Sequence, residues 1–568
     1  MESGVAKQTY PGQDSGQGSG ALLSTLRSLT SAGSKQLLLG MGLASLSGFL
    51  WFLACPNLDL WPLAWVAMLP VLFAMERASS SRRAVFFAGW ASLIGNSAGF
   101  YWIVGLLERF ARVPRVIAIL LLLLLGSYQA SRFLLFALAV RFIRRKLSMP
   151  MSLVAPVVMV AVELCVPFIF SYNLAITQAR QGHVIQIAEL TGPLGVTALL
   201  MMINGAIFDV LVEGRRRLTS AAISFAILAA ALGYGHLRIN QIAEQRAQAP
   251  KIKVGIVQPN VGFGEKGLGT TNVANEYLTG LQLRSAELEA AGADLIVWPE
   301  TIYPSYIPRQ AGSDWPQHPL RIRRGFETPL IFGALTRDVT AHDRRLYNSA
   351  LVLDHHGRLT GRYDKNYLLM FGEYMPGLER FPWIRRFLPR DAEEYAWGNE
   401  IVTFPLQTRD GRTWRLGPMI CLEDTLPAFG RRLAQLHPHV MINLTEDSWY
   451  GDTSEPWQHL ALSIYRSIEL RTELVRAVNP GVSAYVDAAG RVYMQTYSVD
   501  PAKNRRGPDK VLAEVALIEG GHTVYAAMGD LFGYLNVTAT IVSLFLPRLL
   551  RVPMSRAANQ GDHSFSAC

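Results

Sequence analysis

With 568 residues, the chain is too long for one ordinary core, and a composition that is 50% hydrophobic and only 17% charged points to membrane spans. The formal net charge is +10, but Lys and Arg gather in short loops between apolar runs, which argues against nucleic acid as a partner. The four cysteines have neither paired nor metal-ligand spacing, so we expect neither a disulfide framework nor a zinc site. No cofactor and no metal ligands are expected.

Gly, Ser and Gln are abundant in residues 1–34, and this composition predicts a disordered N-terminal tail. A seven-helix transmembrane domain is expected over residues 35–237, and a C-terminal transmembrane helix over residues 522–547. No cleavable signal peptide is expected, because the first apolar run is long enough to stay as a span. The expected spans are Gln36–Ala54, Leu60–Met75, Ala84–Leu107, Val116–Val140, Met149–Phe170, Leu190–Phe208, Leu218–Gly235 and Thr523–Leu546.

Basic residues are unevenly distributed between the loops that join these spans. The positive-inside rule favours a cytoplasmic N-terminus, because the inner loops then carry most of the basic residues. Residues 238–521 would lie outside the cytoplasm, and the basic tail 548–568 would return to it. The inner loops hold Arg77, Arg82, Arg83, Arg141, Arg144, Arg145, Lys146, Arg215, Arg216 and Arg217, and the outer loops hold Arg109, Arg112, Arg115 and Arg180.

Residues 238–521 alternate short β-type runs with helical ones, which predicts a layered α/β domain. Helical patterning covers Asn272–Ala290 and Gln458–Glu473. The aromatic and basic passage Glu379–Phe387 has two interpretations that stay open, an amphipathic arm on the membrane interface or a packed loop. The expected strands are Lys251–Gln258, Ala293–Trp298, Leu330–Leu335, Asn348–Leu353, Arg415–Cys421, His439–Leu444 and Val482–Val486.

Three side chains in this segment could form a catalytic set. Glu300 and Cys421 each close an apolar run, and Lys365 lies between them in the chain. A thiolate can attack an ester or amide carbonyl, a carboxylate can take and return the thiol proton, and an ammonium can stabilise the oxyanion. Each residue alone more often has a packing or surface role, but strand ends meet at one rim of a sheet, so the three can converge.

The segments around these residues, Val297–Glu300, Tyr363–Lys365 and Met419–Glu423, resemble the signature motifs of the nitrilase (carbon–nitrogen hydrolase) superfamily. With the flanking spans and Phe371–Pro376, the chain resembles one branch, the apolipoprotein N-acyltransferases. The resemblance covers residues 35–550, and its further matching segments are Asp447–Asp452, Gln458–His459 and Arg476–Ser483.

The resemblance implies a nitrilase-like αββα sandwich on the periplasmic side of the bacterial cell inner membrane. It also implies a ping-pong acyl transfer in which Cys421 takes an acyl chain from a membrane phospholipid as a thioester. The acceptor would be the N-terminal amine of a diacylglyceryl-cysteine apolipoprotein. Glu300 would be the general base and Lys365 the oxyanion stabiliser, with Glu373 and Glu423 in support. A monomer in contact with the lipid bilayer is expected.

Two positions depart from the family pattern. Leu422 follows the nucleophile where Tyr is common, and the loop after the first strand holds only Phe263 where Trp is common. Both residues, with Tyr374 and Trp449, are expected to contact substrate, so the departures bear on substrate preference rather than on thioester chemistry. Glu446 stands where Asn is frequent, and the sequence does not explain that exchange.

Two other functions stay open. With the same three residues and water as the acceptor, the chain would be a membrane-tethered nitrilase-type amidase or hydrolase, and its product would be free fatty acid or ammonia. The third possibility is a non-catalytic membrane binding protein on a degenerate enzyme scaffold. The joint presence of Glu300, Lys365 and Cys421 argues against that third possibility.

Overall fold

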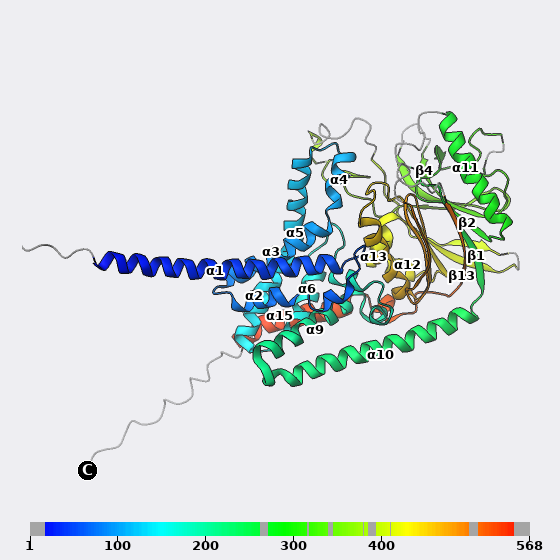
Figure 1. Ribbon diagram of the computed structural model, residues 1–568. Helices are drawn as coiled ribbons and strands as arrows, with labels where there is room; N and C mark the ends of the chain where they lie inside the picture. The colour runs from blue at the N-terminus through cyan, green and yellow to red at the C-terminus, as the bar shows by residue number, and fades with distance from the viewer. Residues whose placement is uncertain are drawn as a thin grey trace, which may run out of the picture.

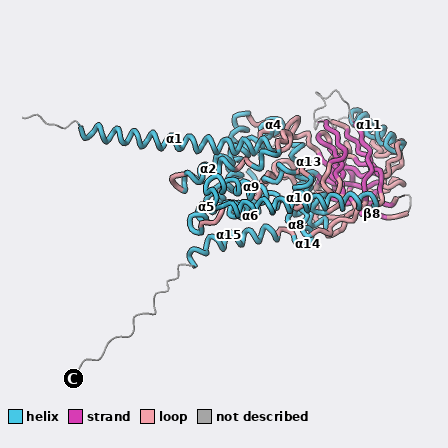
Figure 2. The backbone as a smooth tube through the Cα atoms, turned by 60° about the horizontal axis from the view of Figure 1, so that its bottom comes forward, coloured by secondary structure: helices cyan, strands magenta, loops and turns pink. Residues whose placement is uncertain are grey.

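The structure is a computed structural model that describes residues 17–261, 271–314, 317–338, 345–378, 380–383, 394–408, 411–498 and 509–549. Helices fill one end of the molecule and two β-sheets fill the other (Figures 1 and 2). The long helix α10 (Leu218–Gln248) leads from the helical part into strand β1 (Lys251–Gln258). Helix α10 therefore crosses the domain boundary expected at residue 237.

Three helical segments of the described chain are long and apolar enough to cross a membrane, namely Ser34–Ala54, Arg115–Leu147 and Pro193–Gln248. A fourth is the pair α3 (Ser81–Gly99) and α4 (Trp102–Arg109), if this pair, bent by 53°, counts as one span. The apolar runs predict eight spans, so several of them form shorter or more broken helices than expected. Besides α3, α4 and α10, the α-helices of this part are α1 (Gln17–Ala54), α2 (Leu69–Arg77), α5 (Arg115–Leu147), α6 (Met151–Cys165), α7 (Gly182–Ile185), α8 (Ala188–Thr191), α9 (Pro193–Glu213), α14 (Val524–Met528) and α15 (Leu531–Leu549).

Proline and glycine account for two of the broken runs. Leu60–Met75 forms a short 3-10 helix followed by α2, and the second residue of each piece is a proline, which has no backbone N–H to donate. Thr523–Leu546 is interrupted between α14 and α15 at Gly529, whose φ is +60°. At the other end of the chain, α1 begins at Gln17, inside the segment for which composition predicts a disordered tail.

The first sheet has the strand order β13-β1-β2-β4-β5-β6, with β3 beside β4, and the second has the order β12-β11-β10-β9-β8-β7. All seven strands that the sequence predicts are present; β1 has the predicted bounds, and the ends of the other six differ by one or a few residues. Strands β3, β6, β7, β10, β12 and β13 are additional. The bounds are β2 (Leu295–Val297), β3 (Tyr306–Pro308), β4 (Leu330–Arg337), β5 (Leu346–Leu353), β6 (Leu359–Asp364), β7 (Phe404–Gln407), β8 (Thr413–Ile420), β9 (Val440–Thr445), β10 (Glu473–Val478), β11 (Gly481–Val486), β12 (Val492–Ser498) and β13 (Asp509–Ala516).

The two sheets pack face to face, with helices on their outer faces. Helix α11 (Thr271–Ala290) packs against β1 and β13, and α13 (Glu455–Leu470) packs against β10 and β11, beside α12 (Pro427–Ala434). Tyr485 of the second sheet donates its hydroxyl to the backbone oxygens of Val254 and Val511 in the first sheet, at 2.7 and 3.0 Å. These contacts confirm the predicted αββα layering.

The helices of the second sheet face the helical part, whereas α11 lies on the far side (Figure 1). Tyr465 of α13 donates its hydroxyl to the Ala175 carbonyl at 2.7 Å. Gln458 of α13 donates to the Gly99 carbonyl at 3.0 Å and accepts from the Trp102 indole at 3.3 Å. Hydrogen bonds from α13 thus reach both halves of the bent pair α3–α4.

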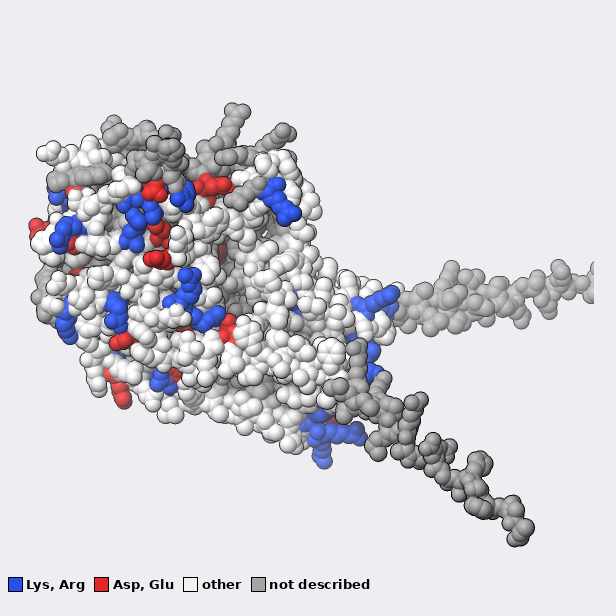
Figure 3. All heavy atoms as spheres, turned by 180° about the vertical axis from the view of Figure 1, so that it is seen from behind, with Lys and Arg blue, Asp and Glu red and all other residues white. Residues whose placement is uncertain are grey.

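Charged side chains are unevenly distributed over the face drawn in Figure 3. Lys, Arg, Asp and Glu are spread over the α/β part, whereas the helical part is mostly uncharged. Lys and Arg reappear at the end of the helical part that lies farthest from the sheets. An uncharged surface with basic residues at one end is typical of a domain that spans a membrane.

Candidate active site

Glu300, Lys365 and Cys421 each follow the end of a strand. Glu300 comes three residues after β2, Lys365 comes directly after β6, and Cys421 comes directly after β8. Strands β2 and β6 belong to the first sheet and β8 to the second, so both sheets contribute to the site. The three residues are 4%, 1% and 6% exposed, and the Cys421 thiol interacts electrostatically with Glu300 and Lys365. The fold therefore brings together the three residues that the sequence predicts.

The ammonium group of Lys365 lies between two carboxylates. Its Nζ is 3.1 Å from Glu300 Oε1 and 2.9 Å from Glu373 Oε1. Burial disfavours the charged form, but the charges of Glu300 and Glu373 outweigh burial and raise the pKa of Lys365 well above its ordinary value. Lys365 is therefore a fixed positive charge inside the site.

Asn348 of β5 also contacts both carboxylates, although sequence reasoning assigned it no role. Its Nδ2 donates to Glu300 Oε1 at 2.7 Å and to Glu373 Oε1 at 2.8 Å. Its carbonyl accepts from the Lys365 backbone N–H at 2.9 Å. A buried amide side chain needs hydrogen-bond partners, so an asparagine inside the fully buried strand β5 is the signal that could have identified it.

Cys421 lies at a sharp turn from β8 into the 3-10 helix η6 (Cys421–Thr425). Its φ is +52°, in the left-handed region that side chains disfavour. Burial raises the pKa of the Cys421 thiol well above its ordinary value, the charge of Glu300 raises it further, and Lys365 opposes both effects. Burial therefore favours the protonated thiol, and Glu300, Glu373 and Asp447 are carboxylates whose charges act on it.

Glu423 connects the Cys421 turn to the segment that carries Lys365. Its Oε2 accepts from the Ile420 backbone N–H at 2.8 Å. Its Oε1 accepts from the Tyr363 hydroxyl at 2.7 Å and from the backbone N–H groups of Asn366 and Tyr367 at 2.7 and 3.1 Å. Burial raises the pKa of Glu423 to about 7, and the hydrogen bonds from Ile420 and Tyr363 oppose that rise.

Two of the predicted substrate contacts are Leu422, which packs against the hydrophobic core, and Trp449, which packs against the end of α4. Leu422 follows the nucleophile and is half-buried against the hydrophobic core. The Trp449 ring lies 4.3 Å from the Phe110 ring, between centroids, and the Trp449 carbonyl accepts from Arg109 Nη2 at 3.2 Å. Trp449 thus lies where the α/β part meets the end of α4, and both substrate roles stay predictions.

The other two predicted substrate contacts are Tyr374 and Phe263. Tyr374 packs against Trp397, with 5.1 Å between ring centroids. Phe263 lies outside the described residues, and so does most of the passage Glu379–Phe387. Their roles also stay predictions.

Comparison with known proteins finds two family models that match the chain. The model described as "Apolipoprotein N-acyltransferase N-terminal domain" matches residues 47–206, and the model described as "Carbon-nitrogen hydrolase" matches residues 253–502. The first region lies in the helical part and the second in the α/β part, which carries all three candidate catalytic residues.

Among the relatives that carry the name "Apolipoprotein N-acyltransferase" are proteins from three bacteria. The protein of Geobacter metallireducens is 29% identical over 517 residues, which cover 88% of this chain and 94% of that protein. The protein of Bdellovibrio bacteriovorus is 29% identical over 75% of this chain and 80% of its own length. The protein of Sinorhizobium medicae is 33% identical over 49% of this chain and 51% of its own length.

Proposed function

This chain belongs to the apolipoprotein N-acyltransferase family and is an acyltransferase, and on this premise we propose that it acylates apolipoproteins from a membrane phospholipid. The acceptor is the N-terminal amine of a diacylglyceryl-cysteine. The observation that carries the proposal is the buried Lys365 ammonium, held between Glu300 and Glu373 and coupled to the Cys421 thiol.

In the first half-reaction, Glu300 takes the thiol proton while Cys421 Sγ attacks the carbonyl carbon of the sn-1 ester. Negative charge develops on the carbonyl oxygen, where the Lys365 ammonium and a backbone N–H after Cys421 stabilise it. The ester C–O bond then breaks, and Glu300 returns the proton to the departing oxygen. The products are a Cys421 thioester and a lysophospholipid.

In the second half-reaction, the neutral amine of the diacylglyceryl-cysteine attacks the thioester carbonyl carbon. Glu300 accepts the proton that the nitrogen loses, the C–S bond breaks, and the proton returns to the sulfur. The products are an N-acylated apolipoprotein and the original thiol. Burial of all three residues restricts water, which favours the amine over hydrolysis.

Both substrates carry acyl chains that leave a bilayer only at a cost of ~0.8 kcal/mol per CH₂, so they should reach the site laterally within the membrane. The contact of Trp449 with Phe110 and Arg109, at the end of α4, supports such a route. The basic groups at the far end of the helical part favour a cytoplasmic location for that end. The α/β part of a monomer would then lie in the periplasm, at the inner membrane.

The direct test uses the purified full chain in detergent with a phospholipid that carries a labelled sn-1 acyl chain. We expect the intact mass of the wild-type protein to increase by one acyl group, located on the Cys421 peptide, and Cys421→Ala to show no increase. Addition of a diacylated lipopeptide should then remove the label from the protein and increase the peptide mass by one acyl group. Cys55→Ala, which changes a cysteine of the helical part, is the matched control and should behave as the wild type.

Label on the Cys421→Ala protein would refute the assignment of the nucleophile. Release of labelled free fatty acid, with no acylated lipopeptide, would instead identify the protein as a hydrolase with the same three residues.

A further inference from the structure

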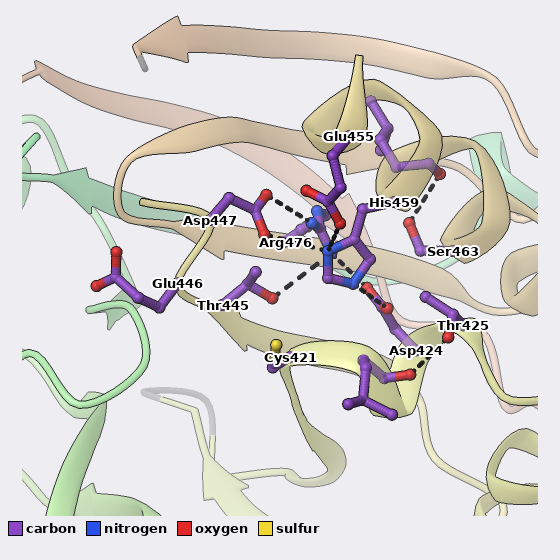
Figure 4. Close-up of polar contacts among 12 residues, drawn as sticks. Cys421, Asp424, Thr425, Thr445, Glu446, Asp447, Glu455, His459, Ser463 and Arg476 are labelled. Carbon is purple, nitrogen blue, oxygen red and sulfur yellow. Dashed lines mark hydrogen bonds and ion pairs between the residues drawn. The ribbon is translucent and has the colours of Figure 1, made fainter. Parts of the chain in front are cut away.

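Four charged side chains from four separate segments meet behind Cys421 (Figure 4). Asp424 lies in η6, Asp447 follows β9, His459 lies on α13, and Arg476 lies on β10. Their exposures are 0%, 1%, 4% and 0%. We call these four residues the ion-pair network. Burial of charges at this density is costly unless every charge is paired.

Each carboxylate of the network uses one oxygen for His459 and the other for Arg476. His459 Nε2 lies 2.9 Å from Asp424 Oδ1, and His459 Nδ1 lies 3.1 Å from Asp447 Oδ1. Arg476 Nη1 lies 2.6 Å from Asp424 Oδ2, and Nη2 lies 3.1 Å from Asp447 Oδ2. Because ionised carboxylates only accept, both nitrogens of His459 must carry a proton, and the two positive charges then balance Asp424 and Asp447. A third carboxyl group, Glu455, lies 3.8 Å from His459 Nδ1, but burial and the charge of Asp447 raise its pKa well above its ordinary value, which favours its neutral form.

The network reaches the nucleophile at two points. Asp424 belongs to the same 3-10 turn as Cys421. Arg476 Nη1 also donates to Asn443 Oδ1 at 3.2 Å, and Asn443 Nδ2 donates to the Cys421 carbonyl at 3.1 Å. A residue with φ of +52° keeps that conformation only when neighbouring groups restrain it, and these contacts restrain the backbone of Cys421.

We propose that the ion-pair network is a positioning device that holds the Cys421 turn in its left-handed conformation, with His459 as a doubly protonated support and not as a base. The proposal rests on the proposed function, in which Cys421 is the nucleophile. Ligand-type atoms of Asp447, Glu455 and His459 lie within 4.8 Å of one another, as in a metal site. The guanidinium of Arg476 already supplies the positive charge beside Asp447, so a metal ion is not needed there.

The test compares four full-length proteins in detergent: the wild type, His459→Gln, Asp424→Asn and the double variant. The first readout is the single-turnover rate of acylation from labelled phospholipid, with the KM for phospholipid measured alongside. The second is the rate at which iodoacetamide alkylates the Cys421 peptide, followed by mass spectrometry. Thermal unfolding gives the folded fraction, to which both rates are normalised. Ser463→Ala, a buried change one turn further along α13, is the matched control.

We expect each single variant to lose about 10- to 100-fold in acylation rate, the range seen when a group that orients a functional residue is lost, with little change in KM. The loss of acylation rate in the double variant should be smaller than the product of the two single-variant losses. The reason is that removal of one cation and one anion together leaves no unpaired buried charge. The alkylation rate of Cys421 should differ from the wild-type rate in the single variants. In the double variant it should lie closer to the wild-type rate. Ser463→Ala should match the wild type.

Unchanged rates in the folded fraction of both single variants would overturn the proposal and leave the network a purely structural role. Stoichiometric metal in the purified wild type, removed by a chelator together with activity, would overturn it in favour of a metal site. If the wild type forms no acyl-enzyme, the proposed function fails. The alkylation rates would then still report whether the network positions the thiol.

Discussion

At the scale of single residues, the site combines a fixed cation with a neutral thiol. Glu300 contacts Lys365 and interacts electrostatically with Cys421, so one carboxylate can stabilise the ammonium and also serve as the base. Two carboxylates that share one cation repel each other, and the Asn348 amide, which donates to both, reduces that repulsion. The charge of Lys365 is thereby kept beside Cys421, and in the proposed mechanism it stabilises the oxyanion.

Replacement of Lys365 by alanine tests that charge. We expect Lys365→Ala to lower turnover by about 10²- to 10³-fold, the usual cost of one oxyanion donor, while membrane insertion is retained. Steady-state transfer to a lipopeptide measures turnover, and gel filtration in detergent checks insertion and folding. Lys253→Ala, at an exposed position on β1, is the control. Unchanged turnover in Lys365→Ala would remove Lys365 from the mechanism.

At the scale of elements, buried carboxylates join segments that would otherwise move independently. Glu423 ties the end of β8 to the segment after β6, since its two oxygens accept from backbone N–H groups of both. The ion-pair network joins η6, the segment after β9, α13 and β10 in the same way. The relative position of Lys365 and Cys421 therefore depends on hydrogen bonds to side chains that do not take part in the chemistry.

Glu423→Gln is expected to lower both stability and the acylation rate. The amide nitrogen of glutamine would face at least one of the N–H donors that now bind the carboxylate, and an unsatisfied buried donor costs about 1–3 kcal/mol. Thermal unfolding in detergent measures the first effect and single-turnover acylation the second. Glu244→Gln, an exposed change on α10, is the control. A melting temperature equal to that of the wild type would show that the hydrogen bonds of Glu423 contribute no stability.

The ion-pair network makes stability depend on pH. Burial and the charge of Arg476 disfavour the imidazolium, but Asp424 and Asp447 outweigh them and raise the pKa of His459 from 6.5 to about 10. A raised folded-state pKa adds stability that is complete below about pH 6.5 and is lost as the pH rises through about 10. We expect the melting temperature of the wild type to fall more steeply across this range than that of His459→Gln. Parallel curves for the two proteins would contradict a charged His459.

At the scale of the whole molecule, a buried ion-pair cluster connects the helical part to the α/β part. Glu189 of α8 pairs with Arg238 of α10 at 2.6 Å and with Arg471, at the end of α13, also at 2.6 Å. Arg471 further donates to Gln186 Oε1 at 2.6 Å and to the Ala488 carbonyl at 3.0 Å. Together with the hydrogen bonds of α13, the cluster therefore joins the α/β part, which carries the site, to the helical part.

Arg471→Ala should therefore destabilise the connection between the two parts. Loss of one partner of a buried ion pair typically costs about 3–5 kcal/mol, and Glu189 keeps Arg238, so we expect the lower end of that range. Thermal unfolding and limited proteolysis in detergent measure the effect. Arg238→Ala is the comparison, and its loss should be smaller because Arg238 is more exposed than Arg471. An equal loss in both variants would contradict the dominant role of Arg471.

Sequence patterns predicted elements well where the pattern was local and apolar. Strand β1 covers Lys251–Gln258, residue for residue as predicted. The helix predicted over Gln458–Glu473 instead ends at Leu470, and Glu473 begins β10. The charged residues Glu473 and Arg476 are buried in that strand by ion pairs with distant partners, and such charges hide the apolar pattern of a strand.

By itself, the amino-acid sequence determined the apolar runs, the layered α/β class, the family and the three residues at strand ends, because each depends on neighbours in the chain. Only the tertiary structure decided what surrounds those residues. Asn348 lies 48 residues from Glu300, and Arg476 lies 52 residues from Asp424, yet both pairs are in direct contact. Such contacts depend on how strands and helices that are distant in the chain pack together, and local sequence patterns do not predict that packing.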